Sequence, residues 1–390
     1  MSRQHADSTD QPRSSGDGGL FGDVFSTKEM REIFDDAGLV QSWLDVEGAL
    51  ALAQADVGLL PKATADAIVA ECKVEKFDLA ELRRLREIAD HPLVPTVWAL
   101  AARCSPEVGG YVHWGATTQD IMDTGAVLQI RRALAILESR LQNLCAAIAQ
   151  LVDEHQETVM AGRTHGQHAV PITFGFKVAS WLFEAMTDLE RLAAIKERVL
   201  VVEFAGASGT LASVGSHGAA IRSALGKQLG LGERPISWHA SRDAFVETVA
   251  WIGLVAGLCE RIAQEVIALQ RTEIAEVEES QPAGKVGSST MPQKRNPMTA
   301  EGVVATARMA RSMIAPAFET LAGEHERDMS TWESEWDLLP RAFERADGAL
   351  NRTVWLVETL RVDSERMRRN LDVTGGLIVA EAVMIRLAEE

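Results

Sequence analysis

Residues 282–297 carry the densest group of side chains that could act on an anionic substrate. Their sequence is ProAlaGlyLysValGlySerSerThrMetProGlnLysArgAsnPro, in which Ser288 offers a hydroxyl, Lys294 a cation and Asn296 an amide. We expect a helix to start near Pro297, because proline suits the first helical turn. A cation, an amide and the free N–H groups of a helix start favour binding of a carboxylate. Composition alone is equally typical of a mobile glycine-serine loop before a helix.

Two other glycine-rich segments interrupt the chain in a similar way. They are GlyTyrValHisTrpGlyAlaThrThrGlnAsp at 110–120 and AlaGlyArgThrHisGlyGlnHisAlaValPro at 161–171. Polar junctions on a rigid scaffold are common places for function. His165 and His168 could form a metal pair, but no carboxylate or cysteine ligands cluster with them in the sequence, so we expect no metal.

Long helices are predicted to hold these junctions in place. The windows 125–156, 172–202 and 243–279 contain no proline and few glycines. In the second window the apolar residues follow helical spacing: Val178, Trp181, Leu182, Ala185, Leu189 and Leu192. Helices of about 30 residues far exceed the ordinary mean of about 11–12, and several together indicate a long bundle. The predicted fold is therefore all-α.

The rest of the chain divides around this bundle. Residues 1–19 are polar and lack apolar periodicity, so they predict a disordered tail. Residues 20–105 predict an N-terminal helical domain, with a capping box at SerThrLysGlu 26–29. The central bundle is expected over 106–360, with its last helix running from about Asp337 to Leu360. Residues 361–390 are expected to begin a C-terminal helical domain that is short or truncated.

Composition limits the partners and the compartment. The chain of 390 residues has 56 acidic and 39 basic side chains, a formal charge of −17. Such a surface repels phosphates, which excludes nucleic acid and anionic membranes as expected partners. The four cysteines stand far apart, which is typical of a reduced protein. No secretory or membrane-spanning segment is visible, so we expect a cytoplasmic protein.

The segment GlySerSerThrMetProGlnLysArgAsnPro resembles the signature loop GSSxMPxKxN of the fumarase/aspartase superfamily. That superfamily includes fumarase, aspartase, argininosuccinate lyase, adenylosuccinate lyase and carboxymuconate cycloisomerase. The other two junctions resemble its remaining motif regions, in the expected order, so the resemblance covers most of the chain. It implies a homotetramer with a twenty-helix core, active sites each shared by three subunits, and no cofactor.

The resemblance also implies roles for individual residues. Ser288 would be the general base that removes a proton from carbon, with its alkoxide stabilised in a closed loop. His165 would deliver a proton to the leaving group, oriented by Glu301. The resemblance further implies the following substrate-binding residues: Thr117, Thr118, Thr164, Gln167, Ser241, Lys294, Asn296 and Arg327.

Three segments outside these junctions resemble the corresponding segments of carboxymuconate cycloisomerases. TrpLeuAspValGlu at 43–47, HisProLeuValPro at 91–95 and TrpGluSerGluTrp at 332–336 carry this likeness. The Arg-Tyr pair with which adenylosuccinate lyases bind a nucleotide phosphate is missing from the sequence. Two features depart from the cycloisomerase pattern, because that group tends to lack the Thr164–His165 pair and commonly has glutamine where this chain has Ser241.

These departures favour lyase chemistry on a cycloisomerase-like frame. The expected reaction is β-elimination from a 2-substituted succinate, a small dicarboxylate with an amine or nitro leaving group, to give fumarate. The alternative is the 3-carboxy-cis,cis-muconate cycloisomerase reaction, in which a carboxylate adds within one substrate molecule. An adenylosuccinate lyase and a non-catalytic structural relative are less favoured, the latter because Ser288, His165, Lys294 and Glu301 are all present.

Overall fold

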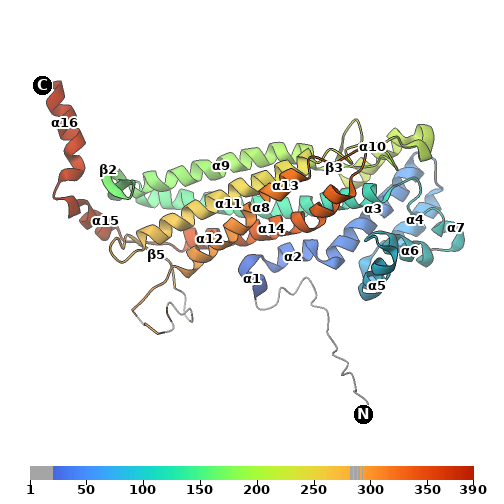
Figure 1. Ribbon diagram of the computed structural model, residues 1–390, viewed down its shortest axis with the longest axis horizontal. Coiled ribbons are helices and arrows are strands. Elements are labelled where there is room, and N and C mark those ends of the chain that lie inside the picture. The colour runs from blue at the N-terminus through green and yellow to red at the C-terminus, as the bar shows by residue number, and fades with distance from the viewer. Residues whose placement is uncertain (1–20, 282–283, 285–287, 289, 292) are drawn as a thin grey trace, which may run out of the picture.

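The computed structural model describes residues 21–281, 284, 288, 290–291 and 293–390, and forms a long helical bundle with smaller elements at both ends (Figure 1). The predicted disordered tail at 1–19 lies outside the described residues. Among the described residues no helix is long and apolar enough to cross a membrane.

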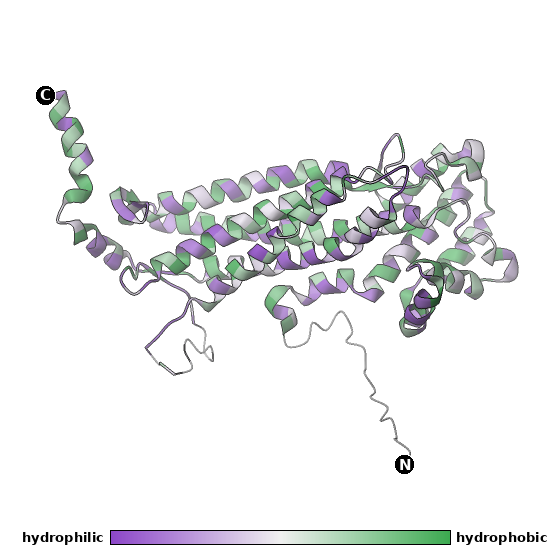
Figure 2. Cartoon of the chain, viewed as in Figure 1, coloured by the Kyte–Doolittle hydropathy of each residue, from purple (hydrophilic) through white to green (hydrophobic). Residues whose placement is uncertain are grey.

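In the described part of the chain, five helices form the bundle and pack on one another. They are α8 (Thr118–His155), α9 (Phe174–Val199), α11 (Asp243–Leu269), α12 (Met298–Arg311) and α14 (Met329–Glu358). The predicted stripe on α9 faces the core, where Val178, Trp181, Ala185 and Leu192 are at most 2 % exposed. Hydrophobic and hydrophilic residues are interspersed along each bundle helix, as expected for helices with one buried face (Figure 2). The all-α prediction is confirmed.

Shorter helices surround one end of the bundle (right in Figure 1) and share a second apolar core with it. The helix α3 (Asp36–Asp56) is central here, since it packs on α4, α8 and α10. The other helices at this end and before it are α1 (Gly22–Phe25), α2 (Lys28–Phe34), α4 (Lys62–Glu71), α5 (Leu79–Ala89), α6 (Val94–Arg103), α7 (Pro106–Gly109), α10 (Gly218–Leu229), and the 3-10 helices η3 (Val74–Lys76) and η4 (Ala212–His217).

The described residues also form three two-stranded sheets between the helices. β1 (Val159–Thr164) and β2 (Gln167–Thr173) form an antiparallel hairpin at the other end of the bundle. β3 (Val201–Val202) pairs in parallel with β4 (Gly232–Glu233), and β5 (Val277–Glu278) pairs antiparallel with β6 (Arg361–Val362). The chain then continues through α15 (Ser364–Leu371), η5 (Asp372–Thr374), η6 (Leu377–Val379) and α16 (Ala380–Glu389). The helix α13 (Ile314–Glu319) links α12 to α14.

Several element boundaries differ from the sequence prediction, and α8 begins at Thr118, seven residues before the predicted window 125–156. Thr27, and not Ser26, caps α2, because the Thr27 hydroxyl accepts the Met30 N–H at 3.4 Å. The helix α11 ends at Leu269, ten residues before the predicted limit, where the chain turns into β5. The helix α14 begins at Met329 and contains Pro340 in its interior. Buried Trp332 and Glu335 hold its early turns, so tertiary contacts outweigh the cost of the proline.

Candidate active site

The predicted site residues fall into two groups at opposite ends of α8. Thr117 and Thr118 begin the helix, and the hairpin carrying Thr164, His165 and Gln167 follows its last residue. The helix has 38 residues, which at 1.5 Å per residue spans about 57 Å. One chain therefore does not bring the two groups together.

Thr117 is the N-cap of α8 and lies beside a cation. Its N–H donates to Asp120 Oδ2 at 2.9 Å in a capping box, which fixes the start of the helix. Arg327 Nη2 donates to Thr117 Oγ1 at 2.9 Å, although the two residues are 210 positions apart. A guanidinium, two threonine hydroxyls and a helix N-terminus together make a site suited to a carboxylate.

A buried polar network lies directly behind this helix start. Asp120 accepts the N–H groups of Ala205 and Gly206 at 2.9 and 3.1 Å, and it lies 2.9 Å from His239 Nε2. Burial raises the pKa of Glu203 to about 7, against the nearby charge of His239. Burial alone would lower the pKa of His239, but its hydrogen bond to Asp120 and the charge of Glu203 outweigh that effect and raise it.

The same three side chains place their ligand-type atoms within 4.8 Å of one another, as a metal site would. Both oxygens of Asp120 already accept backbone N–H groups. We therefore assign Asp120, Glu203 and His239 as a hydrogen-bonded network that fixes the 203–206 segment and the 238–242 turn on α8. Ser241 is exposed on that turn, where its N–H donates to Trp238 O at 2.9 Å.

A second buried network links α8, α11 and α14. Arg242 donates to Asp123 Oδ2 at 2.7 Å and to Glu335 Oε1 at 2.9 Å, and all three side chains are at most 3 % exposed. Trp332 Nε1 donates to Asp123 Oδ1 at 2.9 Å. The one guanidinium donates hydrogen bonds to both buried carboxylates, and this network fixes the first turns of α14 next to Arg327.

His91 belongs with this group, although the sequence prediction assigned it no role. Its ring lies 6.3 Å from that of Trp332, and burial together with the charges of Arg327 and His113 lowers its pKa. The HisProLeuValPro motif was visible at 91–95, but only the fold places it near Arg327. Asp120, Trp332 and Glu335 lie in segments that the sequence analysis singled out, but their partners are 85 to 209 residues away, so the sequence did not reveal the pairing.

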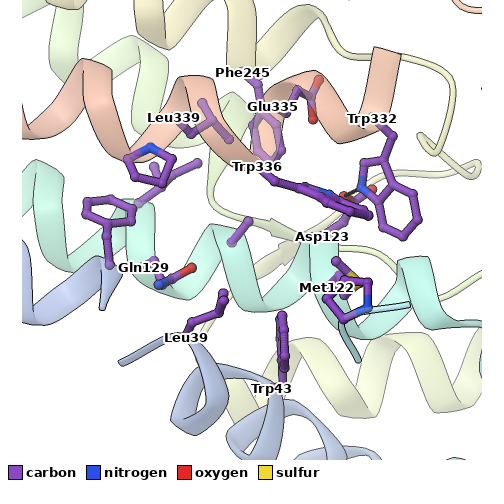
Figure 3. Close-up of a pocket in the computed structure, with 15 residues that line it drawn as sticks. Leu39, Trp43, Met122, Asp123, Gln129, Phe245, Trp332, Glu335, Trp336 and Leu339 are labelled. Carbon is purple, nitrogen blue, oxygen red and sulfur yellow. Dashed lines mark hydrogen bonds between the residues drawn. The ribbon is translucent and has the colours of Figure 1, made fainter. Parts of the chain in front are cut away.

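An aromatic cavity of about 180 Å³ lies beside the second network (Figure 3). Trp43 and Leu39 of α3 face Trp332, Trp336 and Leu339 of α14 across it, with Asp123 and Gln129 contributed by α8. Its two carboxylates are already paired with Arg242. This cavity is mainly apolar and is not where the predicted site residues gather.

At the far end of α8, the hairpin presents His165 at its tip. His165 and Gly166 have φ of 51° and 76°, and Thr164 pairs with Gln167. This is a two-residue hairpin loop with two left-handed residues, for which glycine is favoured and histidine is tolerated. Thr164, His165 and Gln167 are all exposed. In the described part of the chain, no hydrogen bond or ion pair joins His165 to Glu301.

The remaining predicted residues lie in or near the loop before α12, beside a cavity of about 670 Å³. Lys294, Asn296 and Glu301 line it, together with Arg271 and Arg361. Ser288 is half-buried, and its Oγ accepts the Met291 N–H at 3.2 Å. With Arg295 the described lining of the cavity holds four cations against three carboxylates, Glu278, Glu301 and Asp363. This local excess of positive charge would attract a substrate carboxylate despite the acidic balance of the whole chain. The neighbouring loop residues 282–283, 285–287, 289 and 292 lie outside the described residues.

Comparison with known proteins shows the family to which the chain belongs. A model of the lyase family matches residues 24–311. The 3-carboxy-cis,cis-muconate cycloisomerase of Pseudomonas aeruginosa is 42 % identical over 95 % of this chain and 81 % of its own length. The N-acetyl-S-(2-succino)cysteine lyase of Dickeya dadantii is 38 % identical over the same shares of the two chains.

The fold is equally similar to a solved structure. The crystal structure of 3-carboxy-cis,cis-muconate lactonizing enzyme from Pseudomonas putida superposes with a TM-score of 0.91 and 42 % identity, over 95 % of this chain and 83 % of the other. The helix bundle and its end-placed motifs thus define an all-α lyase. The chain belongs to the fumarase/aspartase superfamily, in its cycloisomerase-like subgroup.

Proposed function

We propose that this lyase-family chain catalyses addition or elimination next to a carboxylate, with 3-carboxy-cis,cis-muconate as its first candidate substrate. The likeness to the Pseudomonas aeruginosa cycloisomerase, 42 % identical over 95 % of the chain, carries the proposal. It reverses the order of the two sequence-based hypotheses, in which fumarate-forming elimination with an amine or nitro leaving group stood first.

In the proposed reaction one substrate carboxylate oxygen adds to the carbon β to another carboxylate. The C–O bond forms as the electron pair of the C=C bond moves onto that second carboxylate, which gives an aci-carboxylate dianion. A proton from the Ser288 hydroxyl then forms the new C–H bond, and solvent returns a proton to the Ser288 alkoxide. The substrate trianion thus takes up one proton and becomes a lactone with two carboxylates. Lys294 and Asn296, which line one cavity, would stabilise the dianion.

Elimination from a 2-substituted succinate is the second candidate. The exposed Thr164–His165 pair favours it, because a histidine can protonate a departing basic group. Here the Ser288 alkoxide takes the proton from carbon, the electron pair forms the C=C bond of fumarate, and the leaving group departs. A thioether substituent joins the amine and nitro groups as a candidate, since a relative is named for a 2-succino cysteine substrate.

A homotetramer with shared active sites is part of the proposal. The two groups of site residues at opposite ends of α8 support it, because one chain cannot use both in one centre. Exposed apolar residues on the bundle surface support it as well: Phe176, Phe183 and Met186 of α9 are 70 %, 75 % and 50 % exposed. Such surfaces are typical of interfaces between chains.

Turnover of a substrate panel tests the proposal. The purified chain is incubated with 3-carboxy-cis,cis-muconate and, separately, with 2-substituted succinates carrying amine, nitro and thioether groups. Loss of muconate absorbance without fumarate supports the first candidate, and fumarate release from a succinate supports the second. Turnover of neither class by a correctly assembled protein would contradict both.

A further inference from the structure

Glu276 is a fully buried carboxylate that none of the roles above uses. It lies directly before β5 and is 0 % exposed. Its backbone is fixed on both sides, because its N–H donates to Leu269 O at 2.9 Å and its carbonyl accepts the Asp363 N–H at 3.0 Å. A buried carboxylate whose backbone is fixed cannot reach solvent, so neighbouring groups must supply its hydrogen bonds and its opposite charge.

Compensation comes from the hairpin that carries His165. Arg163 Nη1 and Nη2 donate to the two oxygens of Glu276 at 2.9 and 2.6 Å, a bidentate geometry. Asn370 Nδ2 adds a third bond at 2.7 Å from α15. Forked arginine–carboxylate pairs fix orientation as well as position, which a lysine at the same place would not do.

This ion pair connects the hairpin to the segment directly before β5, two residues from the hairpin tip. Arg163 stands two residues before His165, and among the described residues Thr164, His165 and Gln167 make no side-chain hydrogen bond. The apolar support lies further back, where Ala161 packs with Leu371 and Ile378. The position of the His165 ring therefore depends on the Arg163–Glu276 pair more than on contacts of its own.

A second buried carboxylate lies three residues further along the same segment. Glu279 is 0 % exposed and accepts the N–H groups of Thr299 and Ala300 at 2.9 to 3.0 Å, which caps the start of α12. The first turn of α12 contains Glu301. The segment 276–279 is thus hydrogen-bonded to the hairpin that contains His165 and to the helix α12 that contains Glu301.

We propose that Glu276 is a positioning residue, which acts through Arg163 to hold His165 in the active site. The inference rests on the proposed role of His165. The pair would fix the orientation of the hairpin tip, so that the imidazole is already placed for contact with the substrate. A misplacement of about 1 Å can reduce turnover about 100-fold, so an anchor of this kind has a kinetic consequence.

The test combines Glu276→Gln with His165→Asn in a double-mutant cycle. Glu276→Gln is expected to lower kcat by roughly 10- to 100-fold, with a smaller rise in KM because Thr164 and Gln167 share the hairpin with His165. In the His165→Asn background the same change should cost less than roughly threefold, because the positioned group is already gone. An equal loss in both backgrounds would overturn the proposal.

Two further variants keep the result interpretable. Arg163→Lys retains the charge but loses the fork, so it should reproduce the effect if Glu276→Gln does not fold. Glu265→Gln is the matched control, since Glu265 pairs with Lys177 at 2.6 Å and ties α9 to α11, and neither residue is hydrogen-bonded to Arg163 or Glu276 among the described residues. This control should keep wild-type kcat.

Amide hydrogen exchange separates this inference from the proposed function. In Glu276→Gln, amides of residues 159–173 should exchange at least about tenfold faster, and in Glu265→Gln they should not. Unchanged exchange in Glu276→Gln would overturn the inference even if the enzyme assays succeed. Faster exchange from a protein that turns over no substrate would instead locate the failure in the proposed function.

Discussion

Thr117 and His165 lie at opposite ends of α8, although the sequence resemblance places both in one catalytic centre. Thr117 caps the first residue of this 38-residue helix, and His165 stands at the tip of the hairpin that follows its last. Because α8 is one continuous helix, its two ends lie far apart within one chain. Any centre that uses both residues must therefore take them from different chains.

Two inactive variants from opposite ends should complement each other. We expect Arg327→Met and Ser288→Ala each to lose activity, because one removes the cation beside Thr117 and the other removes the proposed base. When the two are unfolded together and refolded, some assemblies should contain a site with both native residues and regain activity. Each variant refolded alone is the control. Mixed assemblies that form without any activity would contradict the shared-site proposal.

The loss of kcat caused by His165→Asn should depend on the basicity of the leaving group. For a basic leaving group such as an amine, we expect kcat to fall by about 10²–10⁴-fold, the usual contribution of a general acid. For a nitro group, whose nitrite product is a weak base, the loss should be much smaller. Steady-state rates on matched 2-substituted succinates measure this dependence. A loss of equal size on all of them would show that His165 does not donate the proton.

Glu203→Gln should change how stability depends on pH. Burial raises the pKa of Glu203 from 4.5 to about 7, and the pKa of His239 is raised as well. The folded state therefore holds more protons than the unfolded state, so the free energy of unfolding should fall as pH rises through this range. For Glu203 the change amounts to on the order of 3 kcal/mol between pH 4.5 and 7.

Denaturant unfolding at several pH values tests this expectation. The Glu203→Gln variant should show a flatter profile than the wild type across that window, because glutamine does not titrate. Glu247→Gln, on an exposed ion pair with Arg198, is the control and should keep the wild-type profile. A wild-type free energy of unfolding that rises between pH 5 and 7 would oppose the assignment of Glu203.

Arg242→Met should destabilise the whole fold. The substitution leaves Asp123 and Glu335 buried without their shared cation, a loss of about 3–5 kcal/mol for a broken buried pair. Thermal or denaturant unfolding measures the effect. Arg341→Met, which removes an exposed pair with Asp337 on the same α14, should cost less than about 1 kcal/mol. Equal stability of the two variants would mean that the buried network is not structural.

The sequence was sufficient to predict the helical bundle and the three junctions, because apolar periodicity and glycine-rich interruptions are local signals. The stripe on α9 is buried as predicted. The start of α14 was misplaced, since Trp332 and Glu335 are held by partners distant in sequence. The end of α11 was misplaced as well, at Leu269, whose carbonyl accepts the Glu276 N–H. For the same reason the sequence did not reveal the Arg163–Glu276 and Arg242–Asp123 pairs, which are 113 and 119 residues apart.

The central claim is that Ser288 transfers a proton at the carbon next to a substrate carboxylate. The most direct measurement compares wild type and Ser288→Ala in the turnover of 3-carboxy-cis,cis-muconate, followed by ultraviolet absorbance, with unfolding curves as the control for folding. We predict that the wild type converts the substrate and that the variant, equally stable, is slower by at least about 10²-fold. A folded Ser288→Ala variant that converts the substrate at the wild-type rate would contradict the claim.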